Sequence, residues 1–157
     1  MPQIKLTTSI AAPLEVVFDL SRSIDVHQIS MQQSDERAIG GITSGLIQKD
    51  ETVTWQARHL LRKRQLAVKI TRMEPYNFFE DEMLKGDFKL MWHRHYFSFE
   101  NGITTMRDVF FFEAPFGFAG KIFCYLFLTG YMRRLLSRRN FVIKDYAESG
   151  RWTSILS

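Results

Sequence analysis

The chain has 157 residues, of which 45% are hydrophobic and 24% charged, and its formal net charge is +4. This length predicts a single domain, residues 1–157, and the composition is that of a soluble globular protein. The single cysteine, Cys124, excludes an internal disulfide, and no Cys/His spacing is typical of a zinc finger. The start of the chain lacks the basic and apolar regions of a signal peptide, so we expect a cytoplasmic protein.

Basic residues cluster at Arg62–Arg64 and again between Arg133 and Arg139. Such clusters bind phosphates in some proteins, although a solvated surface is the commoner outcome. No RNA-binding aromatic motif, helix-turn-helix signature or zinc-finger spacing accompanies them. Nucleic acid is therefore not expected as a partner.

The first elements are predicted to be a strand and a helix. Apolar and polar residues alternate over Ile4–Ile10, which predicts a strand. Pro13 suits the first turn of a helix, whose apolar stripe runs from Val16 to Leu20. The polar segment Met31–Gly41 ends in two glycines, and we expect a second short helix or a loop there.

Six further strands follow, separated by turn signals, and we expect consecutive strands to pair antiparallel. The predicted strands are Thr43–Gln48, Glu51–Leu61, Gln65–Met73, Asn77–Leu84, Phe88–Phe99 and Thr104–Glu113. A turn is expected at Arg62–Arg64. From Phe116 to Glu148 the sequence has the period of a long helix, apolar nearly all round as far as Met132 and amphipathic beyond it.

The apolar half of this helix, Phe116–Met132, is slightly shorter than a bilayer span and contains Lys121, so we expect it to be buried rather than membrane-spanning. Aromatic side chains at Phe123, Phe127 and Tyr131 can emerge on its far side. An exposed patch there, next to the arginines, predicts a homodimer interface or a peripheral membrane contact through the C-terminal helix.

The strongest turn signal in the chain is Asn101–Gly102. A two-residue loop at this point pairs His95 with Asp108 and Phe97 with Met106. Strand alternation puts these side chains on one mostly apolar face together with His93, Phe99, Phe110 and Phe112, and we expect this face to point inward. A buried imidazole and carboxylate are costly unless they bond to each other or to a ligand, so we look for function here first.

The preceding hairpin allows two registers. A three-residue loop with a bulge, which we prefer to a two-residue loop, sets Phe79 opposite His93 and Asp81 opposite Met91. This choice keeps Phe79 on the inward face and makes Asp81 an inward carboxylate.

The element order, the helix start at Pro13 and the run GDFKLMWHRHYFSFENGITTMRDVFFFEAPFG resemble the START-like, or SRPBCC, superfamily of helix-grip proteins. The nearest resemblance is to small bacterial stand-alone members related to the polyketide cyclase/dehydrase and lipid-transport branches, and it covers nearly the whole chain. It implies an α+β helix-grip fold, with a seven-stranded antiparallel curved sheet around a long C-terminal helix and one or two short helices after the first strand. It also implies an elongated apolar cavity under that helix.

We therefore expect the chain to bind or transport a small hydrophobic ligand, such as a lipid, a quinone, or a sterol-like or polyketide-like molecule. His95 and Asp108 are its predicted central polar anchor. The predicted ligand-binding residues are His93, His95, Asp108, Asp81, Trp55, Phe79, Met83, Met91, Phe97, Met106 and Phe110.

Other interpretations remain open from the sequence alone. His95 and Asp108 can be a purely structural cross-strand pair. In a cyclase- or dehydratase-like enzyme, His95, Asp108 and His93 would supply acid–base chemistry. A third class is a membrane-docking lipid or quinone carrier. The two histidines and Asp108 are also metal-ligand types, but we expect no metal, no cofactor and no catalysis.

Overall fold

The structure is a computed structural model that describes residues 2–156. Its strands are β1 (Gln3–Ile10), β2 (Arg37–Gly41), β3 (Thr52–His59), β4 (Arg62–Glu74), β5 (Phe78–Lys85), β6 (Leu90–Glu100) and β7 (Ile103–Glu113). Its helices are α1 (Leu14–Ser21), α2 (Ile24–Ser30), the 3₁₀ turn η1 (Gln32–Ser34), α3 (Gly117–Phe123), the π-helical turn η2 (Cys124–Leu128), α4 (Thr129–Ser149) and α5 (Thr153–Leu156).

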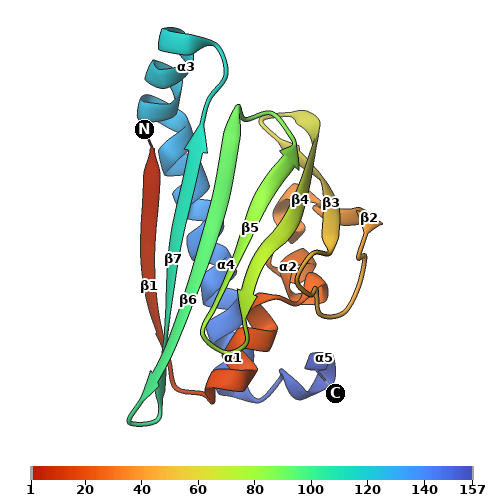
Figure 1. Ribbon diagram of the computed structural model, residues 1–157, viewed down its shortest axis with the longest axis vertical. Coiled ribbons are helices and arrows are strands. Elements are labelled where there is room, and N and C mark those ends of the chain that lie inside the picture. Colours follow the sequence, from red (N-terminus) through yellow and green to blue (C-terminus); the bar gives the residue numbers. More distant parts are fainter. Residues whose placement is uncertain (1, 157) are drawn as a thin grey trace.

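Within the described residues, seven strands form one antiparallel sheet in the order β1-β7-β6-β5-β4-β3-β2. The sheet curves in front of α4, while α1 and α2 lie beside α4 on the same side of the sheet (Figure 1). The first strand closes the meander by pairing with the last one. This is the predicted helix-grip fold.

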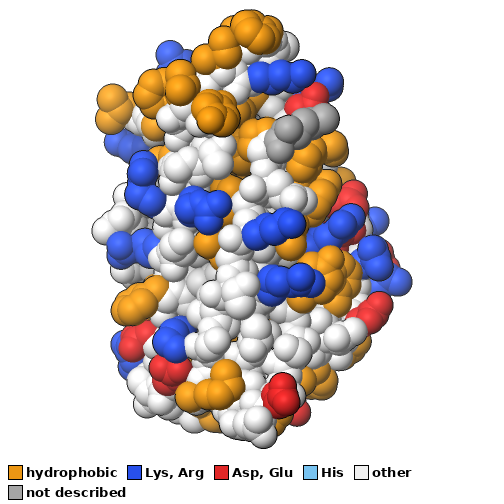
Figure 2. Space-filling view, turned by 90° about the vertical axis from the view of Figure 1, so that its left-hand side faces the viewer, with side chains coloured by type: hydrophobic (Ala, Val, Ile, Leu, Met, Phe, Trp, Pro, Cys, Tyr) orange, Lys and Arg blue, Asp and Glu red, His pale blue; other side chains and the backbone are white. Residues whose placement is uncertain are grey.

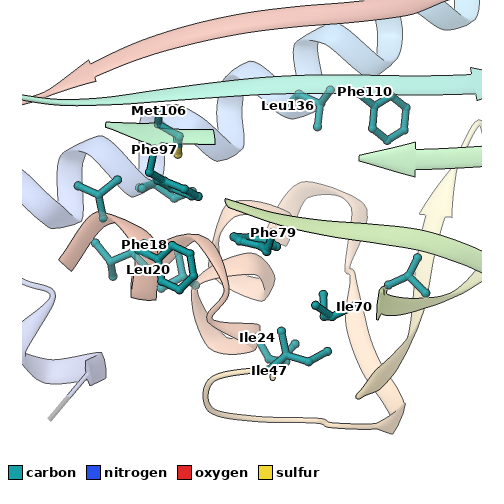
Figure 3. Packing of buried hydrophobic residues seen from close by; sticks show 14 of the residues in the cluster. Phe18, Leu20, Ile24, Ile47, Ile70, Phe79, Phe97, Met106, Phe110 and Leu136 are labelled. Carbon is teal, nitrogen blue, oxygen red and sulfur yellow. The ribbon is translucent and has the colours of Figure 1, made fainter. Parts of the chain in front are cut away.

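The core lies between the concave face of the sheet and these helices. Phe18 of α1 packs edge-on against Phe79 and Phe97, with ring centroids 5.7 and 5.1 Å apart (Figure 3). Leu136 and Ile143 of α4 complete the packing, two turns apart on one face of that helix. Burying one such aliphatic or aromatic side chain contributes about 1.5–3 kcal/mol, so this face of α4 fixes the helix against the sheet.

The hairpin at Asn101–Gly102 forms as predicted. Both turn residues have positive φ, 51° and 79°, which a two-residue loop of this type requires and which Gly adopts without strain. The strands pair His95 with Asp108 and Phe97 with Met106. The predicted inward face is correct up to Phe97, but Phe99, near the tip of the hairpin, is half exposed.

The first predicted strand of the meander is wrong. Strand β2 is Arg37–Gly41, in the segment that we expected to be a helix or loop, and Thr43–Gln48 lies outside the sheet. The two glycines at the end of β2 permit a close approach to β3, because a Cβ on Gly41 would lie 2.2 Å from the carbonyl oxygen of Thr52. The following segment instead bonds to the α1–α2 junction, with Ile47 donating to the carbonyl of Arg22.

The turn expected at Arg62–Arg64 is also wrong, because these residues belong to β4. The chain reverses at Leu60 and Leu61, both at positive φ. Leucine does not favour that conformation, so the sequence carries no local signal for this turn.

The register of the preceding hairpin differs from both alternatives. Asp81 pairs with His93, and Phe79 pairs with His95, a shift of two residues from our expectation. A longer connection, Gly86–Lys89, accounts for the shift. A shift of two preserves the face of every side chain, so Phe79 and Asp81 still point inward.

The long C-terminal helix is present from Gly117 to Ser149, but its apolar half is not buried. The side chains of α3 and η2 that we expected inside are mostly in solvent, and only Gly120 and Cys124 are buried there. In Figure 1, α3 extends past the ends of the strands, which leaves no sheet to cover it. Among the described residues, no helix is long and apolar enough to cross a membrane.

Candidate functional site

A cavity of about 580 Å³ lies between the sheet and the C-terminal helix. Its wall combines apolar side chains of β3–β7 with residues of α2, α3 and α4. Two groups of titratable side chains interrupt the apolar lining, one on β5 and β6 and the other where α2, β3 and α4 meet. The cavity is open to the surface near α3, because exposed Leu60, Phe116 and Phe123 also line it.

Seven of the predicted ligand-binding residues lie in the cavity wall, and their contact with a ligand stays a prediction. These are Trp55, Phe79, Asp81, Met91, His93, His95 and Phe110. The other four are not part of the wall. Phe97 and Met106 pack in the core, Met83 is partly buried near Gly86, and Asp108 lies fully buried behind the histidines.

The central polar group consists of two histidines and two carboxylates that bond across the strands. His93 Nε2 lies 2.9 Å from Asp108 Oδ1, and His95 Nε2 lies 3.0 Å from Asp81 Oδ2. The predicted His95–Asp108 pair is therefore only part of the arrangement, although His95 Nδ1 is 3.1 Å from Asp108 Oδ1. The two imidazole rings are tilted against each other with centroids 3.8 Å apart.

Helix α4 supplies two buried polar residues to this group, Asn140, which the sequence did not single out, and Arg139, which we expected in the exposed basic cluster. Asn140 Nδ2 donates to Asp108 Oδ2 at 2.6 Å, and Arg139 Nη1 lies 3.5 Å from Asp108 Oδ1. Arg139 is itself buried, lines the cavity, and donates through Nη2 to the carbonyl of Ser21 at 2.9 Å. A signal did exist, since Asn140 interrupts the apolar stripe formed by Leu136 and Ile143.

The pKa values of this group reflect burial among fixed charges. Burial, reinforced by neighbouring His95, lowers the pKa of His93 from 6.5 to about 4 although Asp108 opposes this. Burial by itself raises the pKa of the two carboxyl groups. Hydrogen bonds from the histidines and the charge of Arg139 outweigh it, so the pKa of Asp81 lies below its ordinary value and that of Asp108 well below. Both carboxylates are thus charged at neutral pH.

A second polar group was invisible in the sequence, where His27 and His59 had no evident partners. Glu36 accepts a hydrogen bond from His27 Nε2 and lies 3.7 Å from His59 Nε2. His59 Nδ1 bonds the Tyr131 hydroxyl at 2.7 Å, which links β3 to α4. The ring of His27 stacks on Trp55 at a centroid distance of 4.0 Å. These residues come from four separate segments, so only the fold brings them together.

Glu36 is the charged centre of this second group. Burial alone would raise its pKa, but the charges and hydrogen bonds of His27 and His59 lower it from 4.5 to about 2. Burial, together with the Glu36 charge, raises the pKa of Tyr131. The hydroxyl therefore stays protonated and the carboxylate ionised over the physiological range.

The order of strands and helices defines the class of structure, a helix-grip fold, and several solved structures share it. A START superfamily protein from Mycobacterium smegmatis has a TM-score of 0.70 at 9% identity, over 94% of this chain and 97% of that one. Protein TTHA0849 from Thermus thermophilus also gives 0.70, at 15% identity over 90% and 97% of the two chains. Ginseng major latex-like protein 151 from Panax ginseng gives 0.69, at 11% identity over 93% and 97%.

At the level of sequence alone, no family model matches the chain, and no curated protein is significantly similar to it. The identities to the solved structures are low, so these comparisons establish the fold.

Proposed function

We propose that this protein binds one small hydrophobic molecule that carries a polar group, such as a lipid, quinone, sterol-like or polyketide-like compound. The observation that supports this most directly is the cavity, whose volume of about 580 Å³ falls in the range of small-molecule sites. Its lining is mostly apolar, with His93, His95 and Asp81 placed together in the wall. Few polar groups in an apolar pocket orient a ligand while the apolar wall supplies affinity.

The helix-grip fold supports the same proposal. Its resemblance to START-like proteins implies carriage of hydrophobic molecules in the space that this cavity occupies. The buried charges of Asp81, Asp108 and Arg139 then have a role, because they hold the two imidazoles in one orientation toward the cavity.

Filling the cavity should weaken ligand binding. Ala57 is buried in the cavity wall on β3, whereas its neighbour Gln56 is not part of the wall. We expect the indole of Ala57→Trp to occupy the volume that the ligand needs. Affinity for a hydrophobic ligand should fall at least tenfold, because overpacking costs about 1–3 kcal/mol. Gln56→Trp adds an indole to the opposite face of the sheet and should leave affinity unchanged. Native mass spectrometry of the purified variants, followed by lipid extraction, would identify the carried molecule.

Two results would contradict ligand binding in this cavity. If the parent protein carries nothing and takes up no fluorescent fatty acid, sterol or quinone probe, the cavity does not serve a hydrophobic ligand. If both tryptophan variants lose the same amount of ligand, binding occurs elsewhere on the protein.

A second proposal concerns delivery, namely that the protein docks on anionic membranes through α3 and η2. The apolar side chains of this end, which we call the apolar tip, are between 44% and 85% exposed; they are Phe116, Phe118, Ile122, Phe123, Tyr125, Leu126 and Phe127. Figure 2 shows hydrophobic side chains gathered at this end of the molecule, with Lys and Arg side chains beside and below them. An exposed patch of this kind marks an interaction surface.

Charge favours a membrane as the occupant of this surface. No acidic residue occurs between Glu113 and Asp145, whereas Lys121, Arg133 and Arg134 lie in the same stretch and are at least partly exposed. Basic residues around an apolar helix face attract anionic headgroups. Because Phe116 and Phe123 also line the cavity, docking would place the open end of the cavity against the lipid.

Vesicle flotation tests the docking proposal. We expect the protein to float with phosphatidylcholine vesicles containing phosphatidylglycerol, less with phosphatidylcholine alone, and less again as salt screens the charges. Replacing Phe118 and Tyr125 by Ser should weaken binding at least about tenfold, since each buried aromatic contributes on the order of 1.5–3 kcal/mol. Phe141→Ser is the matched control, an exposed phenylalanine on α4 outside the tip.

Absence of flotation at low salt would contradict membrane docking. A dimer that dissociates in the Phe118/Tyr125 double variant would instead assign the apolar tip to a second copy of the chain.

A further inference from the structure

The two histidines and two carboxylates of the central group do not satisfy one another completely. A neutral imidazole donates through one nitrogen and accepts through the other. His95 faces a carboxylate at each nitrogen, Asp81 at Nε2 and Asp108 at Nδ1. Within the described residues, Nδ1 is the only buried side-chain nitrogen or oxygen atom without a hydrogen-bond partner. A buried group of this kind calls for a physical explanation.

We propose that Asp81, His93 and His95 form a binding site for a divalent transition-metal ion such as Zn²⁺ or Fe²⁺. The three residues each offer one ligand atom, and these atoms lie within 4.8 Å of one another. A cation between His95 Nε2 and Asp81 would leave the imidazole proton on Nδ1. Nδ1 lies 3.1 Å from Asp108 Oδ1 without forming a hydrogen bond, so a rotation of the ring on metal binding would let Nδ1 donate to this carboxylate.

His93 fits the same arrangement. Its Nε2 is 2.9 Å from Asp108 Oδ1, so the proton of this ring lies toward Asp108 and the other nitrogen, Nδ1, is left with a lone pair. Both candidate ligand rings therefore share Asp108 as the carboxylate that orients them. Metal-binding histidines commonly donate their second ring N–H to a carboxylate in this way.

The two carboxylates have different roles in this site. Asp108 is fully buried, accepts from Asn140 and lies 3.5 Å from Arg139, so its charge already has partners. Asp81 lies in the cavity wall, and His95 is its hydrogen-bond partner among residues 2–156. The sequence suggested Asp108 as the metal-ligand carboxylate, but the structure favours Asp81.

The geometry needs only a small adjustment to hold an ion. Ligand atoms about 2.1 Å from one Zn²⁺ lie about 3.4 Å apart, so the widest separation must close by side-chain rotation. Two imidazoles and one carboxylate, with positions left toward a cavity, are a ligand set typical of zinc enzymes and of non-haem iron sites. All three residues line the cavity, so a ligand oxygen or a water would complete the coordination there.

The test is metal binding by the full chain after removal of metal with a chelator. Zn²⁺ titration by calorimetry should show one equivalent bound, and Co²⁺ should produce a visible absorption band. Metal analysis of the protein as isolated provides a further readout, and bound Zn²⁺ should raise the melting temperature. None of these measurements depends on the hydrophobic ligand, so this inference can fail while the proposed function holds, and the reverse.

Variants make the test specific to the three residues. We expect Asp81→Asn to lower Zn²⁺ affinity by more than Asp108→Asn, whose loss should be about 10- to 100-fold, as is usual for a group that orients metal ligands. His59→Gln is the matched control, because it removes a cavity-lining histidine of the second polar group. It should bind Zn²⁺ like the parent protein.

Circular dichroism of each variant separates loss of the site from loss of the fold. No saturable Zn²⁺ or Co²⁺ binding by the folded parent protein would overturn the inference. Unchanged affinity in a folded Asp81→Asn variant would overturn it as well.

Discussion

Arg139→Met is expected to destabilise the protein by about 3–5 kcal/mol, the usual cost of removing one partner of a buried ion pair. The guanidinium joins three parts of the fold, since it bonds the carbonyl of Ser21 at the end of α1, the side chain of Asn140 on α4 and, at 3.5 Å, the carboxylate of Asp108 on β7. Methionine fills similar space but leaves the charge of Asp108 with one cationic partner fewer. Urea unfolding monitored by circular dichroism measures the loss.

The neighbouring arginine provides the control for this prediction. Arg138 is exposed, so Arg138→Met should change stability by no more than about 0.5 kcal/mol. Adding Asp108→Asn to Arg139→Met should cost less than the sum of the single changes, because the two side chains interact. Stability of Arg139→Met within about 1 kcal/mol of the parent, with the same m-value, would show that the pair does not hold α4 to β7.

Glu36→Gln is expected to reduce stability at neutral pH and to flatten its dependence on pH below 4.5. In the folded protein the pKa of Glu36 falls from 4.5 to about 2, so its stabilising contribution is complete above pH 4.5 and disappears as the pH falls toward 2. At about 1.4 kcal/mol for each pH unit, this contribution is at most about 3 kcal/mol. Thermal unfolding of both proteins from about pH 2 to neutral pH measures it.

The difference between the two stability curves isolates Glu36 from the other carboxylates, which titrate in both proteins. Glu100→Gln is the control, because Glu100 is exposed at the tip of the β6–β7 hairpin and should follow the parent curve. Parallel loss of stability in the parent and Glu36→Gln below pH 4.5 would mean that His27 and His59 do not stabilise the Glu36 charge.

The two polar groups of the cavity differ in how they are built, and this suggests different roles. His93, His95 and Asp108 sit on one continuous β-hairpin, so strand geometry fixes them relative to one another. The Glu36 group joins α2, β3 and α4 near the open end of the cavity, where His59 bonds Tyr131. The first group is rigid enough to orient a ligand or an ion, whereas the second links the elements on either side of the cavity.

Local patterns predicted the hairpin chemistry well. Asn101–Gly102 determines its own turn, because few other residue pairs adopt two consecutive positive φ angles, and that turn fixes the pairing of His95 with Asp108. The alternation of side chains along each strand then predicted the inward face. That prediction is correct even for β5, where the predicted register with β6 is wrong by two residues. Signals that depend on two or three adjacent residues can be recognised in this way.

The remaining features depend on contacts between distant segments. The sequence placed a strand at Thr43–Gln48, but β2 forms earlier because its glycines fit against β3. It placed the apolar half of the last helix inside, but α3 lies beyond the ends of the strands and stays exposed (Figure 1). No local sequence pattern predicts either outcome.

By itself, the sequence determined the helix-grip order of elements, the hairpin and the inward histidines. Only the tertiary structure decided that Asp81, rather than Asp108, faces the cavity beside both imidazoles, that Arg139 and Asn140 reach Asp108 from α4, and that Glu36 joins His27 to His59. The physical reason is that the periodicity of a strand or helix fixes which way a side chain points. The partners that the side chain meets depend on how the curved sheet packs against the helix.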